Sequence, residues 1–336
     1  MNNQLKVLVA DPDGTIQRVL KDTHIPPEWE LTILQSSSPG ELYPALRDSE
    51  VLVVRNVPVG RAELETASNL RLVQKFGRRT ENIDLEAARD LGIGVGTMPL
   101  EHGVWVAEHA LTLMLALTKK LLPAHAGVMT GENPEGIQSF RTTQTRTTYN
   151  WTALEGRGTL FRRAVGIVGL GEIGTEVAIR TRSFDMEILY YNPPAFRLTS
   201  EAEAELGVTF QPLDQLLSRA DYVTLHVPHT SETEALFGPK EFALMKPNAY
   251  FINCSRGGVV HEGALCHALA TGQIAGAGLD VFEYEPLPSD SELLRLENVV
   301  LTPHIAGGPL ETIAAEGQEL IDRIVLATDP YSCRES

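Results

Sequence analysis

The sequence predicts an α/β protein of two domains, each a parallel sheet flanked by helices. The chain has 336 residues, more than one hydrophobic core usually holds. Short apolar runs alternate with helix-like stretches along most of the chain, which is typical of strands joined by helices. In addition, a glycine-rich G-x-G-x-x-G turn directly follows one of the apolar runs, as at a strand-to-helix turn of such a fold.

The first series of predicted strands lies in the first third of the chain. Its apolar runs cover residues 5–10, 51–55, 72–76 and 93–95. Residues 102–120 follow as a long segment that is apolar on most faces, so we expect a buried helix. Residues 126–160 carry Gly, Thr, Asn and Arg without an apolar period. This composition predicts a long surface excursion between the domains.

A second series of strands begins after this excursion. The apolar runs cover residues 164–169, 188–191, 222–226, 249–253, 276–280 and 299–301. They are continuous rather than alternating, which indicates strands that helices cover on both faces. A closing helix is expected over residues 309–326.

Charge and composition narrow the classes of partner. Lys and Arg total 28 against 44 Asp and Glu, a formal net charge of -16, which disfavours nucleic acid and anionic membrane. No apolar run reaches the roughly 18 residues that span a bilayer, and the N-terminus does not resemble a signal peptide, so we expect a cytoplasmic protein. The three cysteines, Cys254, Cys266 and Cys333, form no Cys-x-x-Cys pair, and no metal site is expected.

The glycine motif occupies residues 169–174. Gly169 would permit the tight turn, Gly171 the approach of a pyrophosphate, and Gly174 close packing of helix on strand. The phosphates would lie at the positive end of the helix dipole, beside Glu172 and Ile173. A glycine turn without a ligand is the alternative. Because the motif lies between a predicted strand and a predicted helix, we favour a site for NAD or NADP.

The next strand ends at Asn192, 18 residues after Gly174. An acid that binds the adenine-side ribose is usual at this place. Asn192 can still bind a ribose hydroxyl, but it would not repel a 2'-phosphate, and Arg197 lies near in sequence. We therefore expect NAD as cofactor and keep NADP as an alternative.

Two further loops follow buried strands. Arg256 comes just after the run at 249–253, where its planar guanidinium would match a carboxylate in two bonds. A surface arginine at a turn is the alternative. His304 follows the last strand and precedes glycines, and a carboxylate lies 19 residues earlier. A lone histidine is more often structural, but this combination favours a catalytic one.

These motifs resemble the D-isomer-specific 2-hydroxyacid dehydrogenase family. The matching stretches are VGLGEIG from Val168, NCSRGGVV from Asn253, GAGLDVFEYEP from Gly276 and TPHIAG from Thr302. Similarity extends upstream through NIDLEAARDLGIGV and VAEHALTLMLAL. The resemblance implies a Rossmann-type cofactor domain, residues 118–308, inserted into a substrate-binding domain, residues 1–117 and 309–336. It also implies a homodimer, which the long apolar helix at 104–117 weakly supports.

The resemblance also implies the site residues and the reaction, a hydride transfer between nicotinamide and a 2-oxo or 2-hydroxy acid of D configuration. The catalytic residues would be Arg256, Glu285 and His304, with Glu285 preferred to Glu283 because it directly precedes a proline. Arg256 would bind the substrate carboxylate, and His304 would exchange a proton with the carbonyl oxygen. Glu285 would favour the charged imidazole. Further cofactor contacts would come from His226, Pro228, Cys254 and Asp280, although Cys254 also fits plain core packing.

One loop departs from the family pattern. The loop that normally receives the substrate carboxylate through backbone amides contains Gly77, followed by Arg78 and Arg79. These arginines would bind a second anionic group or block the usual substrate. Alternatively, they point to solvent or pair with Glu81 or Asp84.

Other functions stay open from sequence alone. Members of the wider family act as corepressors and keep the catalytic residues, so an NAD-binding interaction protein is the alternative function. A relative acting on formate or phosphite is less expected, since the loop at Gly77 lacks the residues for it. A phosphoglycerate dehydrogenase is a further alternative, although we expect no regulatory domain to follow Ser336.

Overall fold

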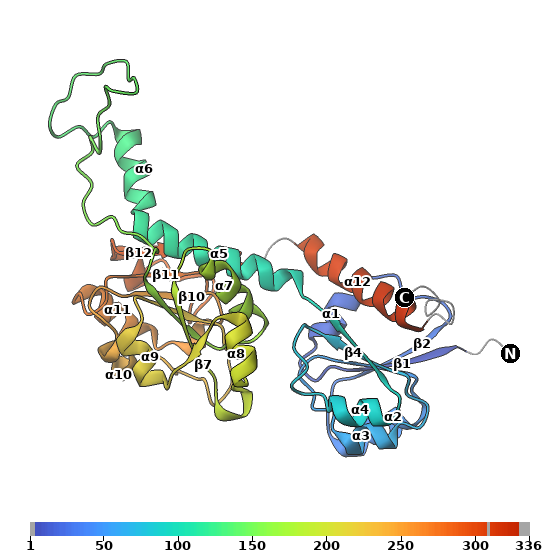
Figure 1. The fold of residues 1–336 in the computed structure, drawn as a ribbon. Coiled ribbons are helices and arrows are strands. Elements are labelled where there is room, and N and C mark those ends of the chain that lie inside the picture. Colours follow the sequence, from blue (N-terminus) through green and yellow to red (C-terminus); the bar gives the residue numbers. More distant parts are fainter. Residues whose placement is uncertain (1–3, 308–309, 329–336) are drawn as a thin grey trace. The chain divides into compact units, whose positions relative to one another are not determined.

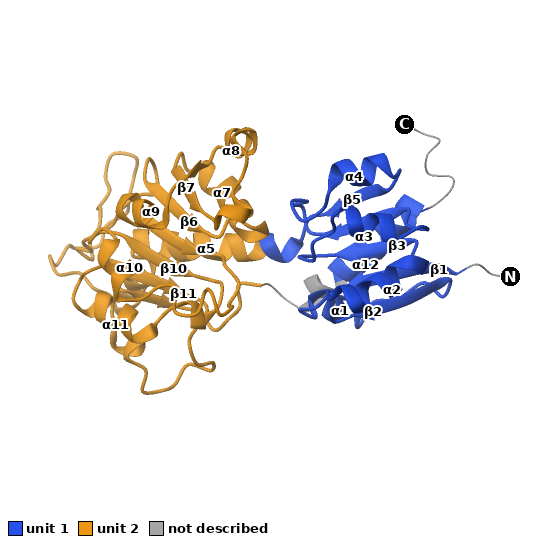
Figure 2. Ribbon diagram, turned by 90° about the horizontal axis from the view of Figure 1, so that it is seen from below, with its two compact units in different colours: residues 1–104, 308–336 blue, residues 105–307 orange. Residues whose placement is uncertain are grey.

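The computed structural model describes residues 4–307 and 310–328. The chain divides into two compact units (Figure 2). Unit 1 combines Met1–Val104 with Gly308–Ser336, and unit 2 is Trp105–Gly307. The first boundary lies within helix α5 (Glu101–Lys119), thirteen residues before the boundary after 117 that the family resemblance suggests.

Unit 1 is a five-stranded parallel sheet with strand order β2-β1-β3-β4-β5. Its strands are β1 (Leu5–Ala10), β2 (Trp29–Leu34), β3 (Val51–Val54), β4 (Leu72–Phe76) and β5 (Gly94–Met98). One face packs against α2 (Pro39–Asp48), α3 (Arg61–Thr66) and α4 (Leu85–Asp90). The other face is covered by α1 (Thr15–Leu20) and the last helix, α12 (Leu310–Thr328). The unit therefore needs both ends of the chain to complete its core.

Unit 2 is a seven-stranded parallel sheet with strand order β12-β11-β10-β9-β6-β7-β8. Its strands are β6 (Ala164–Val168), β7 (Glu187–Tyr191), β8 (Thr209–Phe210), β9 (Tyr222–Leu225), β10 (Tyr250–Asn253), β11 (Gly276–Leu279) and β12 (Val299–Leu301). One face carries α9 (Leu213–Arg219), α10 (Pro239–Leu244) and α11 (Glu262–Ala270). The other carries α5, α7 (Glu172–Arg182) and α8 (Ser200–Leu206). The predicted fold class, parallel sheets flanked by helices, is confirmed in both units.

Helix α5 supplies much of the second core. The helix lies along the sheet of unit 2 (Figure 1). Its side chains Val106, Leu113, Met114 and Leu117 are buried in one cluster with residues of β6, β7, β9 and β10. Most of the apolar surface of this helix is thus covered within its own chain, although Trp105 is exposed. Among the described residues, no helix combines the length and the apolar character needed to cross a bilayer.

The structure differs from the sequence expectation in three places. Strand β2 was not predicted, and neither was the two-residue strand β8. Both lie at sheet edges, where polar residues are tolerated. The surface excursion expected from residue 126 begins later, because α6 (Leu121–Thr130) continues the helical path to Thr130. Residues 131–160 contain turns but no helix or strand.

Candidate active site

The glycine motif forms the turn between β6 and α7. Gly169 has φ +96°, and a Cβ atom there would lie 2.6 Å from the carbonyl oxygen of His226. A Cβ atom on Gly174 would overlap the carbonyl oxygen of Gly169. A Cβ atom on Gly171, by contrast, would meet nothing within 4 Å. The two outer glycines therefore permit close packing, and the middle one leaves open space at the N-terminus of α7, where Glu172 and Ile173 lie.

Asn192, directly after β7, braces this turn. Its Oδ1 accepts a hydrogen bond from the backbone amide of Leu170 at 2.7 Å, and its Nδ2 donates to the carbonyl of Phe196 at 2.7 Å. The side chain is buried. Arg197 stacks over the ring of Phe210 at 4.1 Å and lies 3.7 Å from Glu203. The two polar atoms of the Asn192 side chain thus already bind backbone groups, one in the glycine turn at Leu170 and one in the segment after β7 at Phe196.

His226 lies beside the same turn, at the end of β9. Its Nε2 lies 2.9 Å from the hydroxyl of Thr224. Its Nδ1 is buried and, among the described residues, has no hydrogen-bond partner. Burial lowers the pKa of His226 to about 3, so the ring is neutral. An unsatisfied buried nitrogen beside an open glycine turn fits a site that a polar ligand would complete.

The other expected cofactor residues differ in their surroundings. Pro228 is exposed after the same strand. Cys254 lies in the core against α5, and burial raises the pKa of its thiol, which favours packing over nucleophilic chemistry. Asp280, after β11, is fully buried, and its oxygens accept hydrogen bonds from protein groups.

Arg256, Glu285 and His304 line one cavity of about 390 Å³ in unit 2. His304 Nδ1 lies 2.6 Å from Glu285 Oε2, and Glu285 Oε1 accepts a hydrogen bond from the amide of Phe282 at 3.0 Å. Partial burial raises the pKa of Glu285. The hydrogen bonds from His304 and Phe282 and the charges of His304 and Arg256 outweigh this and hold the pKa below its usual 4.5.

Close packing of two loops brings Arg256 to this cavity. Asn253, the last residue of β10, accepts a hydrogen bond from the Ser255 amide at 3.0 Å and donates one to the Arg256 carbonyl at 3.1 Å. A Cβ atom on Gly257 would overlap the carbonyl of Phe282. Glycine at 257 therefore lets the Arg256 loop lie directly on the loop that carries Glu285.

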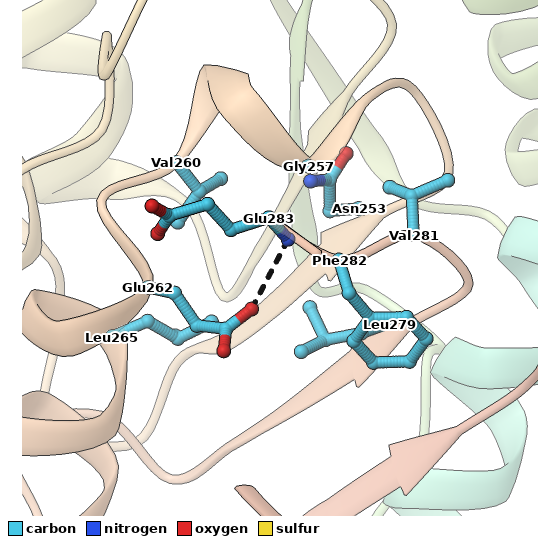
Figure 3. A pocket seen from close by; sticks show the side chains of 9 residues that line it. All are labelled: Asn253, Gly257, Val260, Glu262, Leu265, Leu279, Val281, Phe282 and Glu283. Atoms are coloured by element: carbon cyan, nitrogen blue, oxygen red, sulfur yellow. Dashed lines mark hydrogen bonds between the residues drawn. The ribbon is translucent and has the colours of Figure 1, made fainter. Parts of the chain in front are cut away.

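Glu283, the carboxylate that the sequence analysis did not prefer, lies beside Glu262 of α11. Its backbone amide donates a hydrogen bond to the Glu262 carboxylate at 3.2 Å, and both residues line a small second cavity (Figure 3). It lines the large cavity as well, but the carboxylate that His304 contacts belongs to Glu285.

Two residues of the cavity were missed from sequence. His229 and Glu234 form a close pair through Nε2 and Oε2 at its edge. The His229 ring lies against Gly258, where a Cβ atom would come within 2.7 Å of it. The only sequence signal was a histidine just after Pro228 at a strand end.

The proposed substrate loop belongs to unit 1. Gly77 follows β4 with φ +134°, and its amide donates to the carbonyl of Met98 at 2.9 Å. Arg79 binds Glu81 Oε1 through Nε and through a terminal nitrogen, each at 2.7 Å. Arg78 is exposed. The pairing of Arg79 with Glu81 agrees with one of the two alternatives for this arginine.

No group of three His, Cys, Asp or Glu side chains in residues 4–307 and 310–328 is placed to hold a metal ion.

Most of unit 2 matches a known family. Residues 111–306 match the sequence model of the D-isomer specific 2-hydroxyacid dehydrogenase, NAD binding domain. The chain is 37% identical over 282 residues to glyoxylate reductase of Korarchaeum cryptofilum, covering 83% of this chain and 80% of the relative. It is 35% identical over 325 residues to D-3-phosphoglycerate dehydrogenase of Methanocaldococcus jannaschii, covering 95% of this chain and 57% of that relative. The chain thus spans little more than half the length of that relative.

A solved structure has the same fold. It is D-lactate dehydrogenase from Aquifex aeolicus complexed with NAD and lactic acid, with a TM-score of 0.55 and 28% identity, covering 95% of this chain and 94% of that one. The resemblance seen in the motifs is confirmed by these matches: the chain belongs to the D-isomer specific 2-hydroxyacid dehydrogenase family.

Proposed function

We propose that the protein is an NAD(P)-dependent D-2-hydroxyacid dehydrogenase, or 2-oxoacid reductase. The observation that carries the proposal is the placement of Arg256, Glu285 and His304 on one cavity, with His304 hydrogen-bonded to Glu285. The Arg256 guanidinium can bind the carboxylate of a substrate, and Glu285 orients His304 beside it. Proton-coupled reduction of a 2-oxo acid requires these two functions, a cation for the substrate and an oriented proton donor.

NAD is the proposed cofactor, and NADP remains the alternative because Asn192 replaces the usual acid. The open space over Gly171, the start of α7 and the unpaired Nδ1 of His226 fit a dinucleotide. When bound, the nicotinamide supplies or accepts the hydride. We assign Gly169, Gly171 and Gly174 to the pyrophosphate turn. Glu172, Ile173, Asn192, His226, Pro228, Cys254 and Asp280 complete the proposed surroundings.

The protein's own groups would act as follows. The Arg256 guanidinium binds the substrate carboxylate and polarises the adjacent carbonyl. Because Nδ1 of His304 is held by Glu285, the proton moves at Nε2. His304 gives this proton to the carbonyl oxygen during reduction and takes it from the hydroxyl during oxidation. Glu285 holds the ring in the orientation in which Nε2 is left for this exchange.

Substrate choice is proposed to involve unit 1, the substrate-binding domain of this assignment, through Gly77, Arg78 and Arg79. The Gly77 amide already donates to the carbonyl of Met98, so one backbone amide fewer is left in this loop to bind a substrate carboxylate. Two guanidinium groups in an otherwise acidic chain favour a substrate with a second anionic or strongly polar group. Their charge is partly offset by Glu81, which pairs with Arg79.

A homodimer is proposed from the surface of α6. Leu121, Leu122, Val128 and Met129 are each at least half exposed, on a helix that projects from the sheet of unit 2 (Figure 1). Several large exposed apolar side chains on one short helix favour association with a second copy. Light scattering should give about twice 36.8 kDa. Leu121→Arg should halve that mass, and the exposed Leu294→Arg should not.

The decisive experiment is a turnover screen. Glyoxylate, hydroxypyruvate, pyruvate and bulkier 2-oxo acids are each tested with NADH and with NADPH. We expect reduction of at least one acid and loss of that activity in His304→Gln. Cofactor binding without turnover of any acid would instead favour the alternative, an NAD-binding interaction protein. The family members named above are dehydrogenases and reductases, which argues against that alternative.

A further inference from the structure

The turn that carries His304 is held by the buried carboxylate of Asp280. Oδ1 accepts hydrogen bonds from the Ile305 amide at 3.0 Å and the Thr302 hydroxyl at 2.6 Å, and Oδ2 accepts one from the Ala306 amide at 2.8 Å. One side chain thus binds the chain on both sides of His304. His304 itself has φ +54°, a backbone conformation that non-glycine residues adopt only when their surroundings impose it.

A second histidine, His109 on α5, completes this arrangement from the other side. Its Nε2 lies 2.8 Å from the Thr302 hydroxyl oxygen and 3.4 Å from Asp280 Oδ1. The His109 side chain is 17% exposed, against 1% for Asp280. His109 is 193 residues away from Thr302 in sequence, so only the fold of unit 2 brings them together.

The direction of these hydrogen bonds is determined by their chemistry. A carboxylate only accepts, so the Thr302 hydroxyl donates its hydrogen to Asp280. The Thr302 oxygen must then accept from His109, which therefore carries a proton on Nε2. The Asp280 carboxylate, removed from water, thereby gains a partially positive partner in addition to two amides and a hydroxyl.

We propose that His109 is a positioning residue for His304 and acts through Thr302 and Asp280. By donating to Thr302, His109 fixes the rotamer of that side chain and keeps its hydroxyl aimed at Asp280. Asp280 then holds the Ile305 and Ala306 amides, and the backbone between them presents the His304 ring to Glu285. That these hydrogen bonds serve catalysis rests on the proposed function. That they position the His304 ring does not.

Two amide substitutions at His109 test whether the position of its hydrogen-bond donor, and not the imidazole ring itself, is what matters. The Nε2 atom of glutamine can reach approximately where the histidine Nε2 lies, whereas the asparagine side chain is one methylene shorter and its Nδ2 cannot reach that place. His109→Gln should therefore retain the donor to Thr302, and His109→Asn should lose it. His267→Asn, an exposed histidine on α11, is the matched control.

The first readout is kinetic. We expect His109→Asn to lower kcat about tenfold to a hundredfold, the range for a small misplacement of a reacting group. KM for the 2-oxo acid and Kd for NADH should change less than about twofold. His109→Gln and His267→Asn should keep kcat near the wild-type value. Wild-type kcat in His109→Asn would overturn the proposal, as would equal losses in the glutamine and asparagine variants.

The second readout requires no turnover. The imidazole Cε1–H signal of His304, assigned with His304→Gln, should move in His109→Asn and stay in place in His109→Gln. If wild-type protein reduced no 2-oxo acid, the proposed function would fail, yet this signal would still test the positioning. An unmoved His304 signal in His109→Asn would refute it.

Should His109→Asn fail to fold, Thr302 provides the equivalent test. Thr302→Val keeps the shape and removes the hydroxyl, and Thr302→Ser keeps the hydroxyl. The proposal requires the valine variant to lose kcat and shift the His304 signal while the serine variant retains both. Equal behaviour of the two variants would contradict it.

Discussion

Glu285 binds His304 Nδ1 with one carboxylate oxygen and the Phe282 amide with the other. Both contacts favour the ionised carboxylate, and its pKa lies below 4.5 as a result. A depressed folded-state pKa means that the pair is intact above the unfolded value and is lost as pH falls through the folded value. The ion pair should therefore persist at mildly acidic pH.

This gives a direct titration prediction. The Glu285 carboxyl carbon, followed by NMR, should titrate with a midpoint below 4.5, and the midpoint should rise in His304→Gln because the largest stabilising contact is gone. A wild-type midpoint above 4.5 would mean that partial burial outweighs the hydrogen bonds.

His304→Gln should remove turnover but not cofactor binding. Proton transfer by a positioned side chain contributes about a hundredfold to ten-thousandfold, and His304 lies outside the glycine turn. We expect kcat to fall by that factor and Kd for NADH, from fluorescence titration, to stay within about twofold. His267→Gln is the control, and near-wild-type kcat in His304→Gln would remove His304 from the mechanism.

Arg256→Lys should behave as a disruptive substitution. Lysine cannot make the planar two-bond contact with a carboxylate. The loss of one charged hydrogen bond is worth about 2 kcal/mol, which is roughly thirtyfold in kcat/KM. Arg295→Lys, at an exposed position in the same unit, should have no effect. Equal kinetics for the two variants would show that Arg256 does not contact the substrate.

Asn192→Asp should have two separable effects. A carboxylate cannot donate to the Phe196 carbonyl as the amide does, so urea unfolding should show a stability loss of about 1–3 kcal/mol. The ratio of kcat/KM for NADH over NADPH should also rise, because a carboxylate repels a 2'-phosphate. An unchanged ratio would place Asn192 away from the ribose and leave it only its bracing role.

Arg78→Ala/Arg79→Ala should change the choice of substrate. If the arginines bind a second anionic group, kcat/KM for a dicarboxylic 2-oxo acid falls and that for glyoxylate rises. Glu81→Gln, which removes the carboxylate paired with Arg79, should shift preference in the opposite direction. Equal scaling of both acids in the double variant would assign substrate choice to other residues.

The sequence predicted the strands whose two faces are both buried, such as β4, and missed β2, where Glu30 and Thr32 interrupt the apolar run. An edge strand needs fewer apolar residues, so its signal is weaker. The glycine turn and the loops of Arg256 and His304 were recognisable because each directly follows a buried strand. The contact of His109 with Thr302 was not, since tertiary packing brings together two residues that are 193 positions apart. The pair of His229 and Glu234 lies within one irregular loop after β9, where no periodic pattern marks it.

Helix α12 closes one face of the unit 1 sheet, where Leu320, Ile321 and Ile324 pack with α1, β4 and β5. During synthesis, all of unit 2 leaves the ribosome before this helix does. Unit 2 can therefore complete its core while the first hundred residues still expose the sheet face that α12 will cover. In a chain that ends before α12, that apolar face stays exposed and favours aggregation. Truncation before residue 310 should therefore prevent the folding of unit 1 but not of unit 2.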